Sequence, residues 1–155
     1  MNRWRLAAFM IVLEASLVAA GCNREKLPGL GRVSGTVTLD GQPVPDASIT
    51  FEGAQPGEPP SLGKTDSSGN YELFYSRGHK GATVGEHPVI ISTYQGPTDE
   101  SPDAKKETIP AKYNQKSELK ETVKRGQNKI NFDLKGGGEI IQPDQPPPKA
   151  KKKGK

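Results

Sequence analysis

The stretch VSGTVTLDGQPVPDASITFE, residues 33–52, predicts the fold of this chain. Residues 33–39 alternate between an apolar residue or glycine and a serine or threonine, which is the period of a strand with one buried face. Asp40-Gly41 then supplies a tight-turn dipeptide. Pro43 and Pro45 interrupt pairing, and the alternation resumes over residues 47–52. The stretch therefore predicts two short strands joined by a turn.

The same alternation recurs along the chain. It appears over residues 71–75, 85–94 and 130–134, and in shorter form over 61–65 and 119–123. Pro88 predicts that the 85–94 strand begins at a sheet edge or a bulge. We expect 119–123 to pair with 130–134 after a turn at Gly126. About seven short strands without a helical pattern predict an all-β fold, a β-sandwich.

Composition and charge bound the class of protein. A chain of 155 residues is long enough for one domain. Hydrophobic residues make up 32%, which is low for a packed domain, and the chain carries 18 glycines and 14 prolines. The net charge of +4 comes from the two ends, because residues 22–135 carry no net charge. A neutral domain lacks the basic footprint of a nucleic-acid binder, so we expect no nucleic-acid partner.

The N-terminal residues predict a secretory signal. Two arginines precede an apolar run over 6–20, which is shorter than the ~20 residues that span a bilayer. The run LVAAGC, residues 17–22, resembles the bacterial lipobox. That resemblance implies that residues 1–21 are removed and that the Cys22 thiol carries a lipid. Two other interpretations stay open: an ordinary signal peptide with an incidental cysteine, and a buried apolar helix with a surface thiol.

Three longer motifs carry a family resemblance. They are VSGTVTLDGQPVPDASITFEG from residue 33, GKTDSSGNYEL from residue 63, and VGEHPVIIS from residue 84. Together they resemble the carboxypeptidase-regulatory-like domain of the transthyretin-like superfamily, over residues 32–135. The resemblance implies a β-sandwich and brings no catalytic residue with it. Residues 22–31 are then a tether, and residues 136–155 a disordered tail rich in proline and lysine.

Candidate chemical groups are few. His79 and His87 are the only histidines and lack the companions that a zinc or nucleophilic site needs, so we interpret His87 as a core or edge residue. The run from Asp66 to Gly69 is a structural turn or, less simply, a fragment of a calcium loop. We expect no catalytic residue, no cofactor and no metal.

Residues 95–117 predict a long connection without strand pattern, and loops of this length are functional or disordered. Ile109, Pro110 and Tyr113 could hold it against the sandwich as a solvated connector; the alternative is a ligand site. Phe74, Tyr94 and Tyr113 are the aromatic residues available for stacking on a sugar.

These observations predict a non-catalytic cell-envelope lipoprotein that faces outside the cytoplasm and acts as a binding or structural module with a protein or glycan partner. The alternatives are a carbohydrate-binding module of the cell surface and an accessory domain of an envelope enzyme system. A cluster of five lysines ends the chain: Lys149, Lys151, Lys152, Lys153 and Lys155. It is either a salt-sensitive clasp on anionic lipid or wall polymer, or a solubilising end.

The lipobox resemblance generates the first prediction. Cells fed a labelled fatty acid should incorporate the label into the wild-type chain and not into Cys22→Ser, because the thiol is the acceptor. Gel fluorography of both proteins is the measurement, and equal label in the two would show that Cys22 is not acylated.

Overall fold

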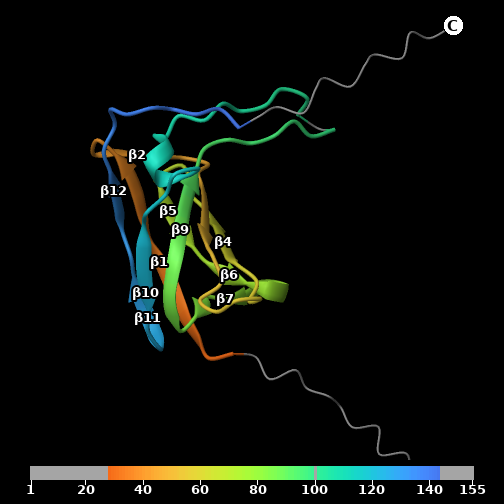
Figure 1. Ribbon diagram of the computed structural model, residues 1–155, viewed down its shortest axis with the longest axis vertical. Coiled ribbons are helices and arrows are strands. Elements are labelled where there is room, and N and C mark those ends of the chain that lie inside the picture. Colours follow the sequence, from red (N-terminus) through yellow and green to blue (C-terminus); the bar gives the residue numbers. More distant parts are fainter. Residues whose placement is uncertain (1–27, 100, 144–155) are drawn as a thin grey trace, which may run out of the picture.

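The computed structural model describes residues 28–99 and 101–143, and these form two six-stranded β-sheets packed against each other (Figure 1). Cys22 and the lysine cluster lie outside the described residues. Within them the helical segments are two short 3₁₀ turns, η1 (Ser76–Gly78) and η2 (Ala111–Tyr113). Neither they nor any other described helix could cross a membrane. The all-β prediction is confirmed.

The first sheet is organised around one strand, β1 (Leu30–Leu39). Along one edge of β1 lie three short antiparallel strands, namely β8 (Ala82–Thr83), β5 (Asn70–Glu72) and β2 (Gln42–Pro43). Along its other edge lie two parallel strands, β11 (Gly126–Lys129) and β12 (Phe132–Leu134). Each of these five strands pairs with β1.

The second sheet is antiparallel throughout. Its strand order is β10 (Lys120–Val123), β9 (Gly85–Ser92), β3 (Ser48–Phe51), β4 (Ser61–Lys64), β6 (Phe74–Tyr75) and β7 (His79–Lys80). Strands β5 and β6 follow each other in the chain but belong to different sheets. The chain therefore crosses from one sheet to the other at Leu73.

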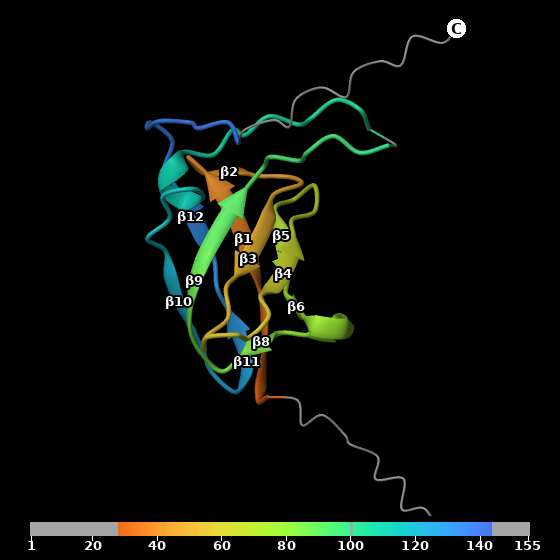
Figure 2. The ribbon, with the colours of Figure 1, turned by 45° about the vertical axis from the view of Figure 1, so that its right-hand side comes forward.

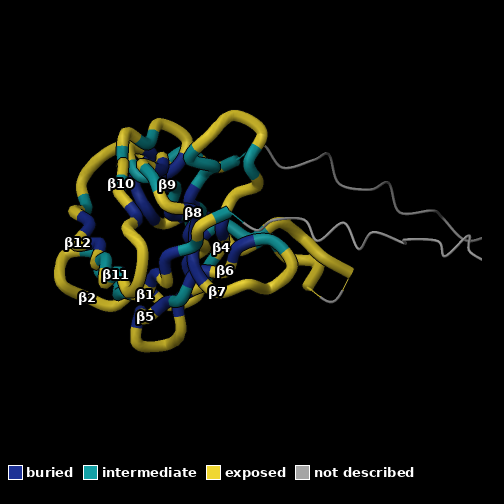
Figure 3. Tube along the Cα trace, turned by 90° about the horizontal axis from the view of Figure 1, so that it is seen from below, coloured by how far each residue is buried: buried dark blue, intermediate teal, exposed yellow. Residues whose placement is uncertain are grey.

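The core lies between the sheets, where the buried apolar residues cluster. Figure 3 shows the buried positions gathered along the facing strands. Phe51 packs edge-on against Phe132, with ring centroids 6.3 Å apart. Side chains with no exposed surface come from both sheets: Val33, Val37, Ile49, Phe51, Leu73, Val89 and Ile91. Burying each contributes about 1.5–3 kcal/mol. The strands predicted at 33–39, 47–52, 61–65 and 85–94 are present in this arrangement. The buried row predicted at 71–75 is also present, but it belongs to two strands, β5 and β6, in different sheets.

The predicted pairing of 119–123 with 130–134 is wrong. Strand β10 pairs with β9, and the last segment pairs in parallel with β1. The turn at Gly126, where φ is +91°, carries the chain from one sheet to the other and does not close a hairpin. The last segment is also two strands and not one. Between them the Asn131 side chain accepts a hydrogen bond from Thr36 N at 3.1 Å, in place of a backbone carbonyl.

Pro88 lies inside the second sheet, between β10 and β3, and not at its edge. Glu52 N donates to Pro88 O at 2.9 Å, but proline has no N–H to return. The Glu52 carbonyl instead lies 2.6 Å from His87 Nδ1. The neighbouring histidine thus supplies the hydrogen bond that the proline cannot, which makes an interior proline tolerable.

The folded region continues past the boundary predicted at residue 135. Gly136 N donates to the Asp40 carboxylate at 3.1 Å, and Ala111 N donates to Glu139 O at 2.8 Å. The side chain of Gln142 exchanges two hydrogen bonds with the backbone of Glu107. Polar contacts hold this segment against the sandwich. The segment has no alternating apolar pattern, so its packing could not be predicted from the sequence.

The close approach of the β11–β12 break to β1 generates a second prediction. A Cβ on Gly35 would collide with the Ile130 carbonyl and lie 2.6 Å from its carbon. We expect Gly35→Ala to lower the free energy of unfolding by about 3 kcal/mol. Gly96→Ala is the matched control, since its nearest contact would be an ordinary 3.8 Å. Urea denaturation of residues 23–155 measures both, and equal midpoints would contradict the assigned contact.

Candidate functional site

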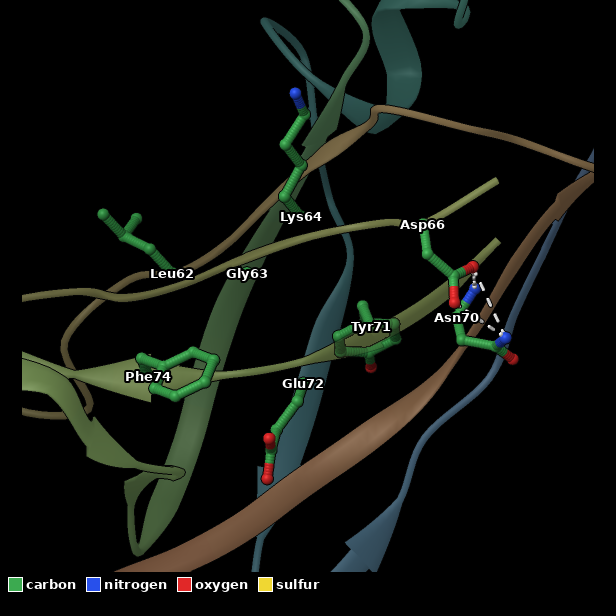
Figure 4. Close-up of a pocket in the computed structure, with 8 residues that line it drawn as sticks. All are labelled: Leu62, Gly63, Lys64, Asp66, Asn70, Tyr71, Glu72 and Phe74. Carbon is green, nitrogen blue, oxygen red and sulfur yellow. Dashed lines mark hydrogen bonds between the residues drawn. The ribbon is translucent and has the colours of Figure 1, made fainter. Parts of the chain in front are cut away.

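A groove opens where β4 and β5 separate (Figure 4). Leu62 of β4 pairs with Phe74 of β6, and the pairing stops there because the chain crosses to the other sheet at Leu73. The groove has a volume of about 710 Å³, within the range of ligand sites, and it is shallow and open. Its lining residues are Leu62, Gly63, Lys64, Asp66, Asn70, Tyr71, Glu72 and Phe74.

One side of the groove is apolar. Leu62 is 53% exposed and Phe74 40% exposed, and they are paired across neighbouring strands. Lys80 Nζ lies 5.8 Å from the centroid of the Phe74 ring and 2.8 Å from the Glu72 carboxylate. The exposed ring is therefore bordered by an ion pair, which leaves apolar surface and charge side by side.

The floor of the groove depends on a glycine. A Cβ on Gly63 would lie 2.8 Å from the Glu72 carbonyl oxygen and 2.9 Å from the Leu73 side chain. Only glycine lets the two strands approach this closely before they separate. Beside it the Tyr71 hydroxyl donates to the Ile130 carbonyl at 2.8 Å. Burial, with a smaller effect from Glu121, raises the pKa of Tyr71, so this hydroxyl keeps its proton.

The polar end of the groove is the predicted turn. Asp66 accepts hydrogen bonds from Ser68 N at 2.8 Å and Asn70 N at 2.9 Å, and Gly69 has φ of +79°. The Asn70 side chain is the main cause of the lowered pKa of Asp66, with the Asn70 backbone second. The carboxylate thus holds its own turn, as predicted for a structural turn. No group of three His, Cys, Asp or Glu side chains in the described part of the chain could hold a metal ion.

The two histidines occupy different surroundings. His79 is exposed in the edge strand β7. His87 is 1% exposed, and both of its ring nitrogens face backbone carbonyls: Nδ1 faces Glu52 O at 2.6 Å and Nε2 faces Thr83 O at 2.7 Å. A carbonyl oxygen only accepts, so a ring nitrogen of His87 hydrogen-bonds to the carbonyl it faces only as a donor. The interpretation of His87 as a core residue is confirmed.

Sequence reasoning missed the most buried carboxylate of the described residues. Glu107 is 4% exposed and forms no salt bridge within that part of the chain. Its oxygens accept from the Thr93 backbone at 3.0 Å, the Thr93 hydroxyl at 2.8 Å and Ile109 N at 2.9 Å, and also from the hydroxyl of Ser92. Burial is the largest single influence and would raise the pKa of Glu107, but the donors together outweigh it and hold the pKa below its ordinary value. The sequence feature that could have indicated its burial is the adjoining apolar pair at 109–110.

Glu107 fixes the long connection to the sandwich. Ile109 is fully buried and Pro110 is buried, as predicted, and the Tyr113 hydroxyl accepts from Lys135 N at 2.9 Å. Residues 95 and 105 form one bridge, beyond which the segment projects from the body (Figure 2). The interpretation of 95–117 as a connector packed partly on the core therefore agrees with these contacts.

The three aromatic residues considered for sugar stacking are not brought together. Phe74 lines the groove, whereas Tyr94 and Tyr113 do not. No family model, no curated protein and no solved structure matches this chain. The groove is thus the candidate site on its geometry alone.

The buried carboxylate generates a third prediction. Glu107→Gln should lower the free energy of unfolding at pH 7 by about 2 kcal/mol, because the donors lose a charged acceptor. The folded pKa of Glu107 lies below the ordinary value of 4.5, so this stabilisation is complete above that value and disappears as the pH falls through the folded pKa.

Urea denaturation of wild type and Glu107→Gln at neutral and acid pH checks this. The difference in free energy of unfolding between the two proteins should become smaller as the pH falls. The exposed Glu118 offers a matched control, and Glu118→Gln should track the wild type at every pH. If that difference stays constant with pH, the charge of Glu107 does not stabilise the fold.

Proposed function

We propose that this chain is a non-catalytic lipoprotein of the cell envelope, anchored through Cys22, whose sandwich presents the β4–β5 groove to a partner. The observation that carries the binding role is the exposed pair Leu62 and Phe74 beside hydrogen-bonding groups in one groove. Apolar surface next to a few placed polar groups is the general composition of a binding site. The carboxypeptidase-regulatory-like resemblance is consistent with a module of this kind.

The buried titratable side chains support a role without chemistry. His87 and Glu107 are the ones a catalytic site would recruit, and each is engaged by hydrogen bonds that join separate backbone segments. Freeing either side chain for proton transfer would break the hydrogen bonds that hold those segments together. What the groove leaves accessible is instead suited to contact: an apolar pair, an ion pair and the polar side chains of a turn.

A carbohydrate partner is the second candidate. The specific observation in its favour is the exposed ring of Phe74, which lines the groove together with Asn70 and Glu72. Sugars stack on aromatic faces, while amides and carboxylates bind their hydroxyls. Phe74 is the one ring that lies exposed in the groove, because Tyr71 is 4% exposed. A protein partner would instead cover Leu62 and Phe74 together.

The groove generates a fourth prediction. A photo-crosslinking amino acid placed at Leu62 in cells should form an adduct with an envelope component, and Phe74→Ser in the same chain should reduce the adduct at least about fivefold by removing an anchor side chain. Immunoblotting of irradiated cells measures the yield. The same amino acid at Ile140, 47% exposed but outside the groove, is the control.

Equal adducts at the two positions would contradict a role for the groove. Digestion of the adduct separates the partner classes, because protease removes a protein partner and a glycan hydrolase removes a carbohydrate.

A further inference from the structure

The end of the sandwich where the chain enters β1 has a distinct surface. Figures 1 and 2 both place the start of β1 at the lower end, together with the β10–β11 turn and the β8–β9 turn. Val84 N donates to Gly29 O at 3.0 Å, and a Cβ on Gly29 would lie 3.5 Å from the Arg125 guanidinium. We call Val84, Lys124 and Arg125 the basic tip.

The charges of the basic tip are available. Lys124 and Arg125 are exposed, and neither forms an ion pair with any residue that the structure describes. Acidic side chains near this end are already engaged. Glu58 accepts from Gln55 N and from the Thr83 hydroxyl, both at 3.1 Å, and Glu86 pairs with Lys120 at 3.3 Å. The basic tip thus presents two cations that no described carboxylate pairs with, although the domain as a whole is neutral.

The basic tip is also partly apolar. Val84 is 42% exposed, one of four large apolar side chains so exposed among the described residues. It lies in the turn between β8 and β9. The hydrogen bond from Val84 N places this turn beside Gly29, and Gly29 in turn lies beside the side chain of Arg125. Cations on the same tip as an exposed apolar side chain match the interface of a lipid bilayer, which offers anionic headgroups above acyl chains.

We infer that the basic tip rests on anionic lipid headgroups of the membrane that holds Cys22, an inference that depends on the proposed lipid anchor. Eight residue steps separate Cys22 from Leu30 and span at most about 28 Å, so the tether keeps the tip near the surface. Each cation that lies within a Debye length of such a surface favours the membrane-bound orientation of the domain by about fivefold. The contact sets the orientation of the domain, with β1 rising from the membrane.

The chain itself supplies the probes for a test. Residues 22–155 contain Cys22 as their one cysteine and no tryptophan, because Trp4 precedes them. The Cys22 thiol is coupled to a maleimide lipid in vesicles of phosphatidylcholine and phosphatidylglycerol that carry a headgroup spin label. Quenching of the tryptophan in Val84→Trp is compared with that in Ile140→Trp, which lies at the other end of the sandwich.

We expect at least about twofold stronger quenching for Val84→Trp than for Ile140→Trp. Adding Lys124→Gln and Arg125→Gln should abolish the difference, as should pure phosphatidylcholine. The matched control, Lys106→Gln with Lys135→Gln, removes two exposed lysines far from the tip and should leave the difference intact.

Equal quenching at both positions, or equal effects of the two charge variants, would overturn the inference. Because the maleimide lipid replaces any acylation, this result is independent of the labelling experiment on Cys22→Ser. Failed labelling with an intact quenching difference would overturn the anchor in cells and leave the lipid-binding surface; intact labelling with no difference would overturn the surface alone.

Discussion

The hydrogen bonding of β1 is the constraint on which the rest of the structure depends. Every other strand of the first sheet is paired with this one strand, so its ten residues align five segments from distant parts of the chain. Its two edges are used differently, antiparallel on one side and parallel on the other. The parallel edge is interrupted where the Ile130 carbonyl comes against Gly35, and the Asn131 side chain completes the pairing at Thr36. A side chain at position 35 would separate the last segment from the sheet.

The groove is a consequence of this arrangement. Strand β5 is recruited by β1, whereas β6, two residues later, pairs with β4 of the opposite sheet. The chain can satisfy both only by crossing between sheets at Leu73, whose side chain is fully buried and holds the crossing in the core. The strands on either side must then separate, and Leu62, Lys64 and Glu72 border the opening. The site that we assign to binding thus lies where β5 and β6, consecutive in the chain, pair with different sheets.

Sequence patterns predicted the strands well because alternation reports burial, which is a local property. They failed where a hydrogen-bond partner decides the outcome. Nothing near Gly126 distinguishes a hairpin from a crossing to the other sheet, and an interior Pro88 is tolerable only because His87 reaches the Glu52 carbonyl. The buried Glu107 resembled any other loop acid, since its donors come from residues around 92 and 109. The groove was equally invisible: its turn and Phe74 were noted separately, and only the loss of pairing after Leu62 brings them together.

The positions of the two chain ends bear on the lysine cluster. The chain enters at the start of β1, and residues 139–142 contact the η2 region at the opposite end of the sandwich (Figure 1). The ten residues of β1 alone span about 33 Å. Lys149 follows Pro143 by six residues, a reach of about 20 Å, and the final lysine by twelve, about 40 Å. If the basic tip faces the anchoring membrane, most of the cluster falls short of that surface. Under that inference, the charge of the cluster is better placed for an anionic polymer beyond the domain than for the lipid that holds Cys22.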